Sequence, residues 1–351
     1  MGKNQPSIFS VITMLLCQLP ASAHVKWFLQ RSEQDLLLQP KPALFTSLNT
    51  QNVAVVLLAG AALYAAYVFN KRMAGSAINT RLRPLCARWQ SPLSLLIGVF
   101  AGTLLIKSAF DMNFMVPNLH LHPCCVWIAQ AEAFIGIGLL LGFCTRACGA
   151  AMIFLLVWSF VKFSPGDCVD LAPMYGLALY ALLAGRGRWS LDYALHISRD
   201  TDPFFQSCAF LCVRLALGFG LISLGLDEKI VNPQLALELL KHAPMLNFAH
   251  PLGMSNELFV LCSGTSEVVL GLMLLFGIFP RVVVCALLLL FVATTATFGM
   301  SEFIGHLPYY AMIIVIFLTG NATADLRSFI RKNLSISSGL NKHLVPLADL
   351  R

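Results

Sequence analysis

Long uninterrupted apolar stretches alternate with short polar segments along most of this chain. Many approach about 20 residues, the length that a helix needs to cross a bilayer, and they are rich in Leu, Ala and Gly. They lack the residue-by-residue alternation of a membrane barrel. The pattern predicts an all-α integral membrane protein whose mature chain has nine spans. They are expected at about 53–69, 92–110, 126–143, 148–163, 172–185, 205–224, 257–276, 282–298 and 307–318.

The composition supports a membrane location. Hydrophobic residues make up 58% of the chain and charged residues 12%, which leaves too little polar surface for a soluble protein of 351 residues. The formal net charge is +7, but the basic residues stand in short clusters between apolar stretches, a topology signal. We therefore expect the lipid bilayer as a partner and no nucleic acid.

The first 23 residues have the features of a secretory signal peptide. Lys3 precedes an apolar stretch from Ile8 to Leu19, and Ala21-Ser22-Ala23 provides a small-residue cleavage site. Cleavage there makes His24 the new N-terminus. An uncleaved anchor is the alternative, but the apolar stretch is short for a span.

Basic residues also predict the orientation of the spans. The polar segment 24–52 is expected to be an extracytoplasmic lead-in without a core of its own, followed by the first transmembrane helix, 53–69. The loop 70–91 holds the densest basic cluster of the chain and is assigned to the cytoplasm. Alternation then places the linker 193–204 and the tail 326–351 on the same side. This predicts a bacterial-type inner membrane protein with an extracytoplasmic mature N-terminus and a cytoplasmic C-terminus.

An internal repeat divides the rest of the chain into two four-helix units, 92–192 and 205–325. Each contains the pattern E-x3-G-x5-G-x3-R, and the pattern Gly98-x8-Lys107 corresponds to Gly220-x8-Lys229. Both units start on the cytoplasmic side and have an even number of spans, so we expect parallel repeats. The residues of the longer pattern are Glu132, Gly136, Gly142 and Arg146 in the first copy and Glu267, Gly271, Gly277 and Arg281 in the second.

Charged residues near the outer ends of the spans are the candidates for chemistry. A charge inside a bilayer is costly and normally needs a partner or a wet cavity, so we expect Lys107 to lie near Glu132 and Lys229 near Glu267. One interpretation is a pocket for protons, a redox-active headgroup or a small anion, and the other is a set of structural ion pairs. The candidate outer-face cluster is Lys107, Glu132, Asp167, Lys229, Glu267, Glu302 and His306.

Two arginines end spans on the side assigned to the cytoplasm. Arg146 and Arg281 close the longer pattern in the two repeats. A cation there suits both the charge bias of membrane topology and the adjoining helix ends. We interpret both as structural topology anchors.

The outer loop His120-Leu-His122-Pro-Cys124-Cys125 has ligands that copper and zinc prefer. His24 at a processed N-terminus is a further metal candidate. A disulfide from Cys124 or Cys125 to Cys168 and plain loop residues are the alternatives.

The motifs together resemble the DoxX family of small membrane proteins. The resemblance rests on Gly98-x8-Lys107, the E-x3-G-x5-G-x3-R block and the closing segment 185–192, Gly-Arg-Gly-Arg-Trp-Ser-Leu-Asp. It covers about residues 92–192 and 205–325, and the second copy ends differently, with Asn-Ala-Thr-Ala-Asp at 321–325. The resemblance implies four-helix units and a redox-linked role, since relatives include a subunit of thiosulfate:quinone oxidoreductase.

These observations lead to one main hypothesis about function. We expect a membrane subunit of a quinone- or sulfur-compound-linked redox complex, with quinone as a possible cofactor and other membrane or periplasmic redox subunits as partners. A non-catalytic assembly or metal-handling protein and a small-solute transporter are the alternatives.

Overall fold

The structure is a computed structural model that describes residues 26, 50–73, 90–197 and 202–320. In these residues the regular secondary structure is helical and forms no strand. Seven of the described helices are long and apolar enough to cross a membrane, and two shorter apolar helices accompany them. The prediction of an all-α membrane protein is confirmed. The predicted signal peptide, most of the lead-in and the C-terminal tail lie outside the described residues.

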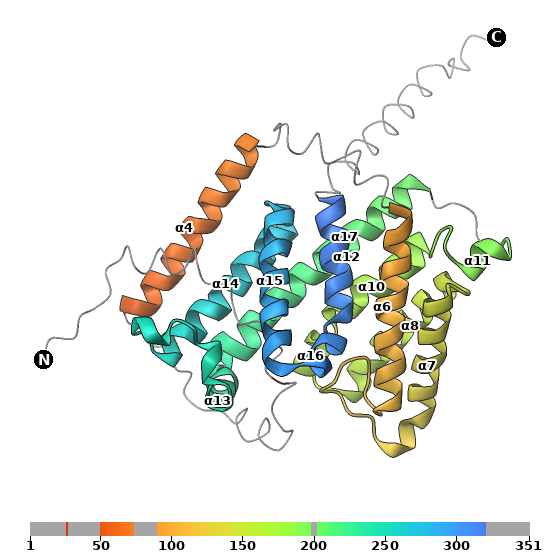
Figure 1. Ribbon diagram of the computed structural model, residues 1–351, viewed down its shortest axis with the longest axis horizontal. Coiled ribbons are helices and arrows are strands. Elements are labelled where there is room, and N and C mark those ends of the chain that lie inside the picture. The colour runs from red at the N-terminus through yellow and green to blue at the C-terminus, as the bar shows by residue number, and fades with distance from the viewer. Residues whose placement is uncertain (1–25, 27–49, 74–89, 198–201, 321–351) are drawn as a thin grey trace, which may run out of the picture.

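The long helices follow the chain order of the two repeats (Figure 1). Helix α4 (Thr50–Met73) comes first. The first repeat contains α6 (Gln90–Phe110), η1 (Pro123–Cys125), α7 (Val126–Leu141), α8 (Thr145–Lys162), α9 (Pro165–Val169), α10 (Ala172–Ala184) and α11 (Leu191–Ala194). The second contains α12 (Pro203–Leu224), η2 (Gly225–Val231), α13 (Pro233–His242), η3 (Pro244–Leu246), η4 (His250–Leu252), α14 (Asn256–Phe276), α15 (Pro280–Phe298), α16 (Met300–Gly305) and α17 (Leu307–Thr319).

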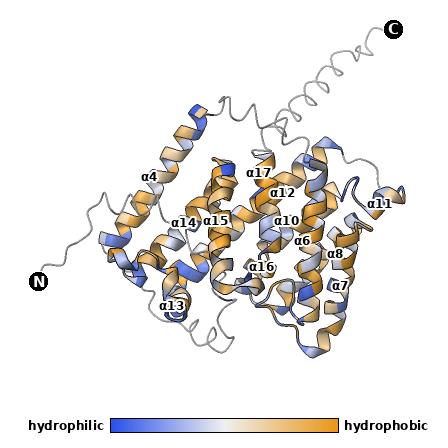
Figure 2. Ribbon diagram, viewed as in Figure 1, coloured by the Kyte–Doolittle hydropathy of each residue, from blue (hydrophilic) through white to orange (hydrophobic). Residues whose placement is uncertain are grey.

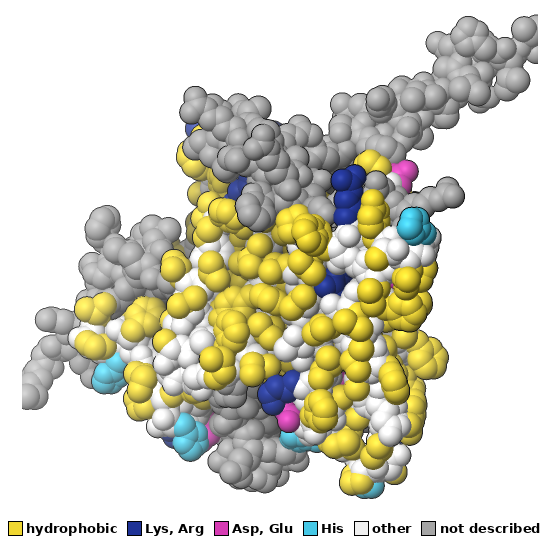
Figure 3. Space-filling model, turned by 45° about the vertical axis from the view of Figure 1, so that its right-hand side comes forward, with side chains coloured by type: hydrophobic (Ala, Val, Ile, Leu, Met, Phe, Trp, Pro, Cys, Tyr) yellow, Lys and Arg dark blue, Asp and Glu magenta, His cyan; other side chains and the backbone are white. Residues whose placement is uncertain are grey.

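Hydrophobic residues make up much of the length of the long helices (Figure 2). Phe134, Phe154 and Val161 are 75%, 67% and 82% exposed. In the space-filling view, hydrophobic side chains form a broad band across the middle of the visible face (Figure 3). An apolar belt of this extent fits a bilayer and would be a liability in water.

The fourth helix of each repeat packs against both repeats, since α10 contacts α8 as well as α12 and α17 contacts α15 as well as α6. Within each repeat the first two long helices pack together, α6 with α7 and α12 with α14. The last helix of the first repeat, α10, packs along α12, and the last helix of the second, α17, packs along α6. Each repeat thus completes its contacts with a helix of the other, and the hydrophobic core continues across both.

Glycine pairs allow the first two helices of each repeat to approach closely. A Cβ atom on Gly136 would lie 2.9 Å from the carbonyl oxygen of Gly102 and 2.8 Å from Cγ1 of Ile106. In the second repeat, a Cβ atom on Gly271 would lie 2.5 Å from the oxygen of Gly218 and 2.7 Å from Cγ1 of Ile222. Small residues of this kind let membrane helices pack backbone to backbone.

These contacts correct the predicted register of the repeat. Gly102 and Gly218 occupy corresponding places, whereas Gly98 faces Arg186 and Gly220 faces Pro173. In the register set by the glycine contacts, the residue that corresponds to Lys107 is Ser223. The expected equivalence of Lys107 and Lys229 was wrong, because a shared spacing of glycine and lysine does not specify which helix each one faces.

The fourth crossing of each repeat is a broken helix. Helices α10 and α17 have 13 residues each, or about 20 Å, which is short for a bilayer. Each is preceded by a short helix, α9 or α16, and has proline in its first turn. Irregular backbone at this depth is tolerated only inside the protein or beside a cavity. The breaks lie at the end of the bundle near α13 and α16, called here the site end (Figure 1).

At the opposite end of the bundle, arginine side chains and a capping carboxylate connect the helix ends. Arg281 Nε donates a 2.9 Å hydrogen bond to the carbonyl of Phe317, and the side chain of Arg146 lies close to Gly185. Both predicted anchors therefore join the third helix of a repeat to the end of the fourth. Asp192 of the closing Ser-Leu-Asp accepts hydrogen bonds from the backbone N–H groups of Cys144 and Thr145, at 2.6 and 2.9 Å.

Candidate functional site

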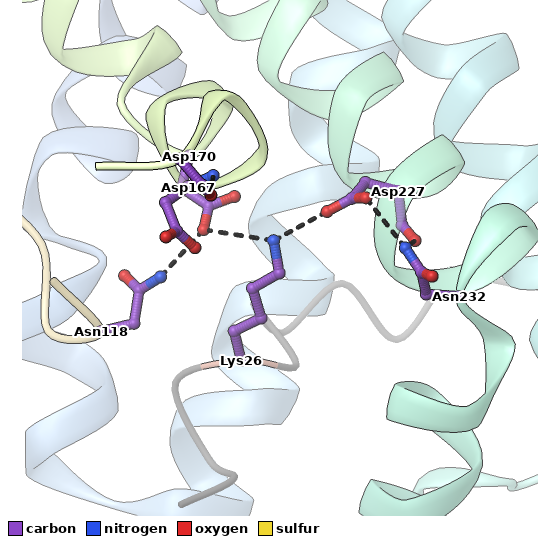
Figure 4. A network of polar contacts seen from close by, with 7 residues as sticks. Lys26, Asn118, Asp167, Asp170, Asp227 and Asn232 are labelled. Atoms are coloured by element: carbon purple, nitrogen blue, oxygen red, sulfur yellow. Dashed lines mark hydrogen bonds and ion pairs between the residues drawn. The ribbon is translucent and has the colours of Figure 1, made fainter. Parts of the chain in front are cut away.

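Lys26 lies buried between the two repeats at the site end (Figure 4). Its side chain is 3% exposed, and Nζ lies 2.7 Å from Oδ2 of Asp227 and 3.9 Å from Oδ2 of Asp170. Burial alone would lower the pKa of Lys26, but the carboxylates of Asp170, Glu228 and Asp227 raise it above its usual range. Lys26 belongs to the lead-in, which was expected to have no core of its own, and its side chain is buried against both repeats.

Asp170 is the carboxylate supplied by the first repeat. It follows α9 at the break before α10, and Asn118 Nδ2 donates a 2.9 Å hydrogen bond to its Oδ2. Burial raises the pKa of Asp170 to about 8; Lys26 opposes this shift and Glu228 adds to it. The raised pKa makes Asp170 the candidate in this group for proton uptake and release near neutral pH.

The second repeat supplies its charges from a wide turn. Residues 225–231 form a π-helix, η2, which continues α12 and carries Asp227, Glu228 and Lys229 in succession. Neighbouring helical residues point in different directions, so the three side chains reach different partners. Asp227 pairs with Lys26, Lys229 pairs with Glu267, and Glu228 is fully buried. We call Asp170, Asp227 and Glu228 the acid cluster.

The predicted pair of Lys229 and Glu267 is formed. Lys229 Nζ donates to Oε1 and Oε2 of Glu267 at 2.6 and 2.7 Å, and the side chains are 3% and 0% exposed. A cavity of about 20 Å³ beside Lys229 is also lined by Ser263 and is large enough for one water molecule. The amphipathic helix α13 covers this region with Leu239 and Leu240. The pair is sealed, which favours the structural interpretation.

Lys107 and Glu132 do not form the expected pair. Lys107 forms a salt bridge with Asp111, one helical turn away, and both side chains are more than 40% exposed. Glu132 is fully buried and accepts a 3.2 Å hydrogen bond from the backbone N–H of Met115. Its partner is therefore a backbone group of the loop after α6, an arrangement that a search for opposite charges does not reveal.

Glu302, His306 and Tyr309 form a buried group beside the acid cluster. His306 Nδ1 lies 3.2 Å from Oε1 of Glu302, and both side chains are almost fully buried. His306 precedes α17, but its side chain forms no capping hydrogen bond there. Tyr309 interacts electrostatically with Asp170 and Glu228 as well as with Glu302. The predicted candidate His306 packs against Tyr309, with ring centroids 5.3 Å apart, and Glu302 lies beside His306.

A pocket of about 230 Å³ opens beside Asn118 and is called here the Asn118 pocket. Asp167 and His120, both candidates from the sequence, contribute polar groups, and His120 Nδ1 lies 2.6 Å from Oδ1 of Asn113. The pocket also contains Phe163, whose ring packs against Phe114 with centroids 5.4 Å apart. Its residues are Asn118, Leu119, His120, Phe163 and Asp167. Asn118 links this pocket to Asp170 in the acid cluster.

The loop cysteines are free thiols. Cys124 Sγ lies 3.1 Å from Nδ1 of His122 and 3.7 Å from Sγ of Cys125. Cys168, the expected disulfide partner, instead lies 3.6 Å from the hydroxyl of Ser159. Among the described residues, no group of three or more His, Cys, Asp or Glu side chains is placed to hold a metal ion. His24 lies outside the described residues.

Sequence reasoning missed Lys26, Asp227 and Glu228 of the central ion network. Nothing in the sequence separates Lys26 from the other charges of the lead-in, and its partner Asp227 lies 201 residues away. A signal for the others was present: three consecutive charges, Asp227 to Lys229, directly follow an apolar span. A single charge at the end of a span can reach water, but three consecutive charges cannot all do so, and those that are buried need partners.

Comparisons with known proteins gave no match: no protein-family model, curated protein or solved structure corresponds to the chain. The fold and the site define a multi-pass α-helical membrane protein with a buried ion network between two halves of the chain.

Proposed function

We propose that the protein is a membrane subunit of a redox complex that binds a quinone-type headgroup in the Asn118 pocket and exchanges protons with it. The observation that supports the proposal is the hydrogen bond from Asn118, which lines the pocket, to Asp170, whose pKa is raised to about 8. A titratable group of this kind, close to a pocket, is a candidate for proton transfer.

The side chains in and beside the Asn118 pocket include the kinds of group that quinone chemistry needs. Reduction of a quinone to a quinol takes up two electrons and two protons, and oxidation releases them. Asn118 and His120 are hydrogen-bonding groups for the ring oxygens, and Phe163 is an apolar surface for the ring. Asp167 in the pocket and Asp170 behind Asn118 are the acids that would carry protons. The electrons would be exchanged with a redox partner subunit.

The pocket is suited in size to a headgroup and not to a whole isoprenoid quinone. Its volume of about 230 Å³ exceeds the roughly 150 Å³ of a cavity that holds benzene. A lipid tail would remain in the surrounding bilayer, against the apolar belt.

This proposal moves the expected site away from the Lys/Glu pairs. Lys229 and Glu267 satisfy each other in a sealed environment, and Lys107 is turned toward Asp111 at the surface. The expected redox role is retained as a proposal, but its residues are those of the broken helix α9/α10 and of the loop before α7.

Metal handling is a second candidate, favoured by one observation. Nδ1 of His122 and Sγ of Cys124 lie 3.1 Å apart, and a third ligand from outside the described residues, such as His24, would have to complete the site. Soft ligands of this kind suit monovalent copper. Metal analysis of the purified protein, compared with a His120, His122, Cys124 and Cys125 quadruple variant, tests this candidate.

Binding of a short-chain quinone to the full-length protein in mild detergent tests the proposed function. Quenching of tryptophan fluorescence is a suitable readout, because Trp158 packs against Phe114, which contacts Phe163. We expect Asn118→Leu and Phe163→Ala each to weaken binding at least about tenfold, the loss expected for one good contact of about 1.4 kcal/mol.

Asp111→Asn is the matched control, since this carboxylate also lies near the site end but outside the pocket residues. It is expected to bind like the wild type. Equal affinity of all four proteins, or no saturable binding by any, would contradict the proposal. Quinone extracted from the purified wild-type protein would support it independently.

A further inference from the structure

The ammonium group of Lys26 occupies a site built by both repeats. Asp170 and Asn118 come from the first repeat, and Asp227 and Glu228 come from the second. Lys26 belongs to neither, because it precedes the first described membrane helix, α4, by more than 20 residues of sequence. The central cation of the network is therefore delivered by the lead-in.

We propose that Lys26 is a positioning residue, whose ammonium group pairs with Asp227 and sets the charge state of Asp170 beside the Asn118 pocket. It acts through Asp170 and Asn118. The inference deepens the proposed function, but it concerns only the ionisation of the acid cluster.

Charge balance supports this role. Asp170, Asp227 and Glu228 carry negative charge when they are ionised, and the burial of such charge costs free energy that a nearby cation offsets. Lys26 neutralises one of them through a 2.7 Å contact with Asp227. The titratable groups that face it from the packed elements are Asp170 after α9, Asp227 and Glu228 in η2, and Tyr309 with Glu302 beyond them.

The geometry separates the effects on the two aspartates. Asp227 is 32% exposed and lies within direct hydrogen-bonding distance of Nζ, so it is the direct ion-pair partner of Lys26. Asp170 is 2% exposed and lies 3.9 Å away, and it receives a hydrogen bond from Asn118 instead. Loss of the ammonium group should therefore make ionisation of Asp170 more difficult. At high pH the acid cluster would lack the positive charge of Lys26.

The test combines a pH profile with chemical rescue on the full-length protein in detergent. Lys26→Ala removes the ammonium group and most of its aliphatic stem, which n-propylammonium replaces. The apparent melting temperature is followed by tryptophan fluorescence from pH 5 to pH 9, with n-propylammonium or tetramethylammonium added at equal ionic strength. Lys26→Arg is the conservative variant, and Lys241→Ala, which removes an exposed lysine paired with Glu238, is the matched control.

We expect Lys26→Ala to lose several degrees more than Lys241→Ala at pH 8–9 and less at pH 5, where Asp170 is protonated. Only n-propylammonium should restore the loss, because tetramethylammonium has no N–H donor. Lys26→Arg should keep the wild-type profile. A loss that is equal at every pH and is not restored by n-propylammonium or by Lys26→Arg would overturn the proposal, because it would indicate packing alone.

If Lys26→Ala does not accumulate, Lys26→Met combined with Asp170→Asn serves the same purpose. This double variant removes one cation and one acid, so it should accumulate and show a weaker pH dependence than the wild type. Its failure to accumulate would count against the proposal. Headgroup binding is not measured in either experiment, so a failure here is distinguishable from a failure of the proposed function.

Discussion

At the scale of single residues, Lys229 and Glu267 offer a test of a sealed ion pair. Glu267→Gln leaves the Lys229 ammonium buried without its carboxylate, and we expect a loss of about 3–5 kcal/mol in the free energy of unfolding. A double change to Lys229→Met and Glu267→Leu removes both charges and should recover most of that loss. Denaturant titration of the protein in detergent provides the measurement.

The exposed pair of Lys107 and Asp111 is the control for this prediction. Because both of its side chains are more than 40% exposed, Asp111→Asn should cost no more than about 1 kcal/mol. If the Lys229→Met and Glu267→Leu double variant were as unstable as Glu267→Gln, the structural ion-pair interpretation would be contradicted. The two charges would then have a specific role.

Asp170 predicts the direction of a pH effect. Its pKa is about 8 in the folded protein and about 4 in an unfolded chain, so the folded state binds a proton more tightly between these values. Stability from this group is therefore fully present below about pH 4 and declines as the pH rises toward 8. Asp170→Asn, which stays neutral, should flatten this part of the profile in thermal melts; an unchanged slope would show that another group causes it.

The central residues show what a sequence can reveal about a site in a membrane. Glu267 and Lys229 were predictable as partners because these opposite charges lie near the same end of neighbouring spans. Lys26 and Asp227 were not, because their contact depends on where a segment outside the helices lies in three dimensions. The partner of Glu132 was missed for another reason: a backbone N–H has no signature in the sequence.

At the scale of helices, the glycine contacts predict a sharp dependence on side-chain size. Gly136→Ala and Gly271→Ala each place a methyl group less than 3 Å from a backbone oxygen of the facing helix. We expect overpacking costs of about 1–3 kcal/mol. Gly60→Ala in α4 is the control, since nothing lies within 4 Å of its new methyl group. Higher intrinsic helix propensity should make this variant as stable as the wild type or slightly more stable.

Thermal melts of the three variants in one detergent provide the comparison. If Gly136→Ala or Gly271→Ala were as stable as Gly60→Ala, the helix pairs would have to separate easily. The register of the repeats would then lose its physical basis.

Helix ends explain where the two copies diverge. Asp192 caps the start of α8, while at the corresponding start of α15 the backbone N–H of Phe279 donates a 3.2 Å hydrogen bond to Oδ1 of Asn70. Helix α4 thus supplies to the second repeat a cap that the first repeat supplies to itself. The nine apolar helices could be predicted from the sequence. The cap that α4 supplies and the π-helix η2 could not, because both depend on tertiary contacts.

At the scale of the whole molecule, duplication has produced an asymmetric site. The glycine contacts and the anchors Arg146 and Arg281 repeat, yet the acid cluster takes one residue from the first copy and two from the second. Repeated features support packing, and the differences between the copies carry the chemistry. Comparison of the two repeats in the sequence therefore predicted the architecture better than it predicted the site.

The orientation of the molecule decides which compartment supplies a redox partner. The basic cluster 70–91 predicts that the site end is extracytoplasmic. Cys124 is exposed near that end, and Cys144 lies near the opposite end at the start of α8. In intact spheroplasts, a membrane-impermeant maleimide should therefore label Cys124, and label on Cys144 should appear only after permeabilisation. Peptide mass spectrometry locates the label, and Cys124→Ser is the control that abolishes the early signal.

The reverse labelling pattern would place the acid cluster and the Asn118 pocket toward the cytoplasm. A periplasmic redox partner would then be excluded, and the protons exchanged at Asp170 would come from the cytoplasm. Early labelling of Cys124 would instead align the pocket with the compartment in which a processed His24 is released, two residues before the buried Lys26. The processed end of the chain and the ion network of the site would then lie on the same side of the membrane, where a partner subunit could reach both.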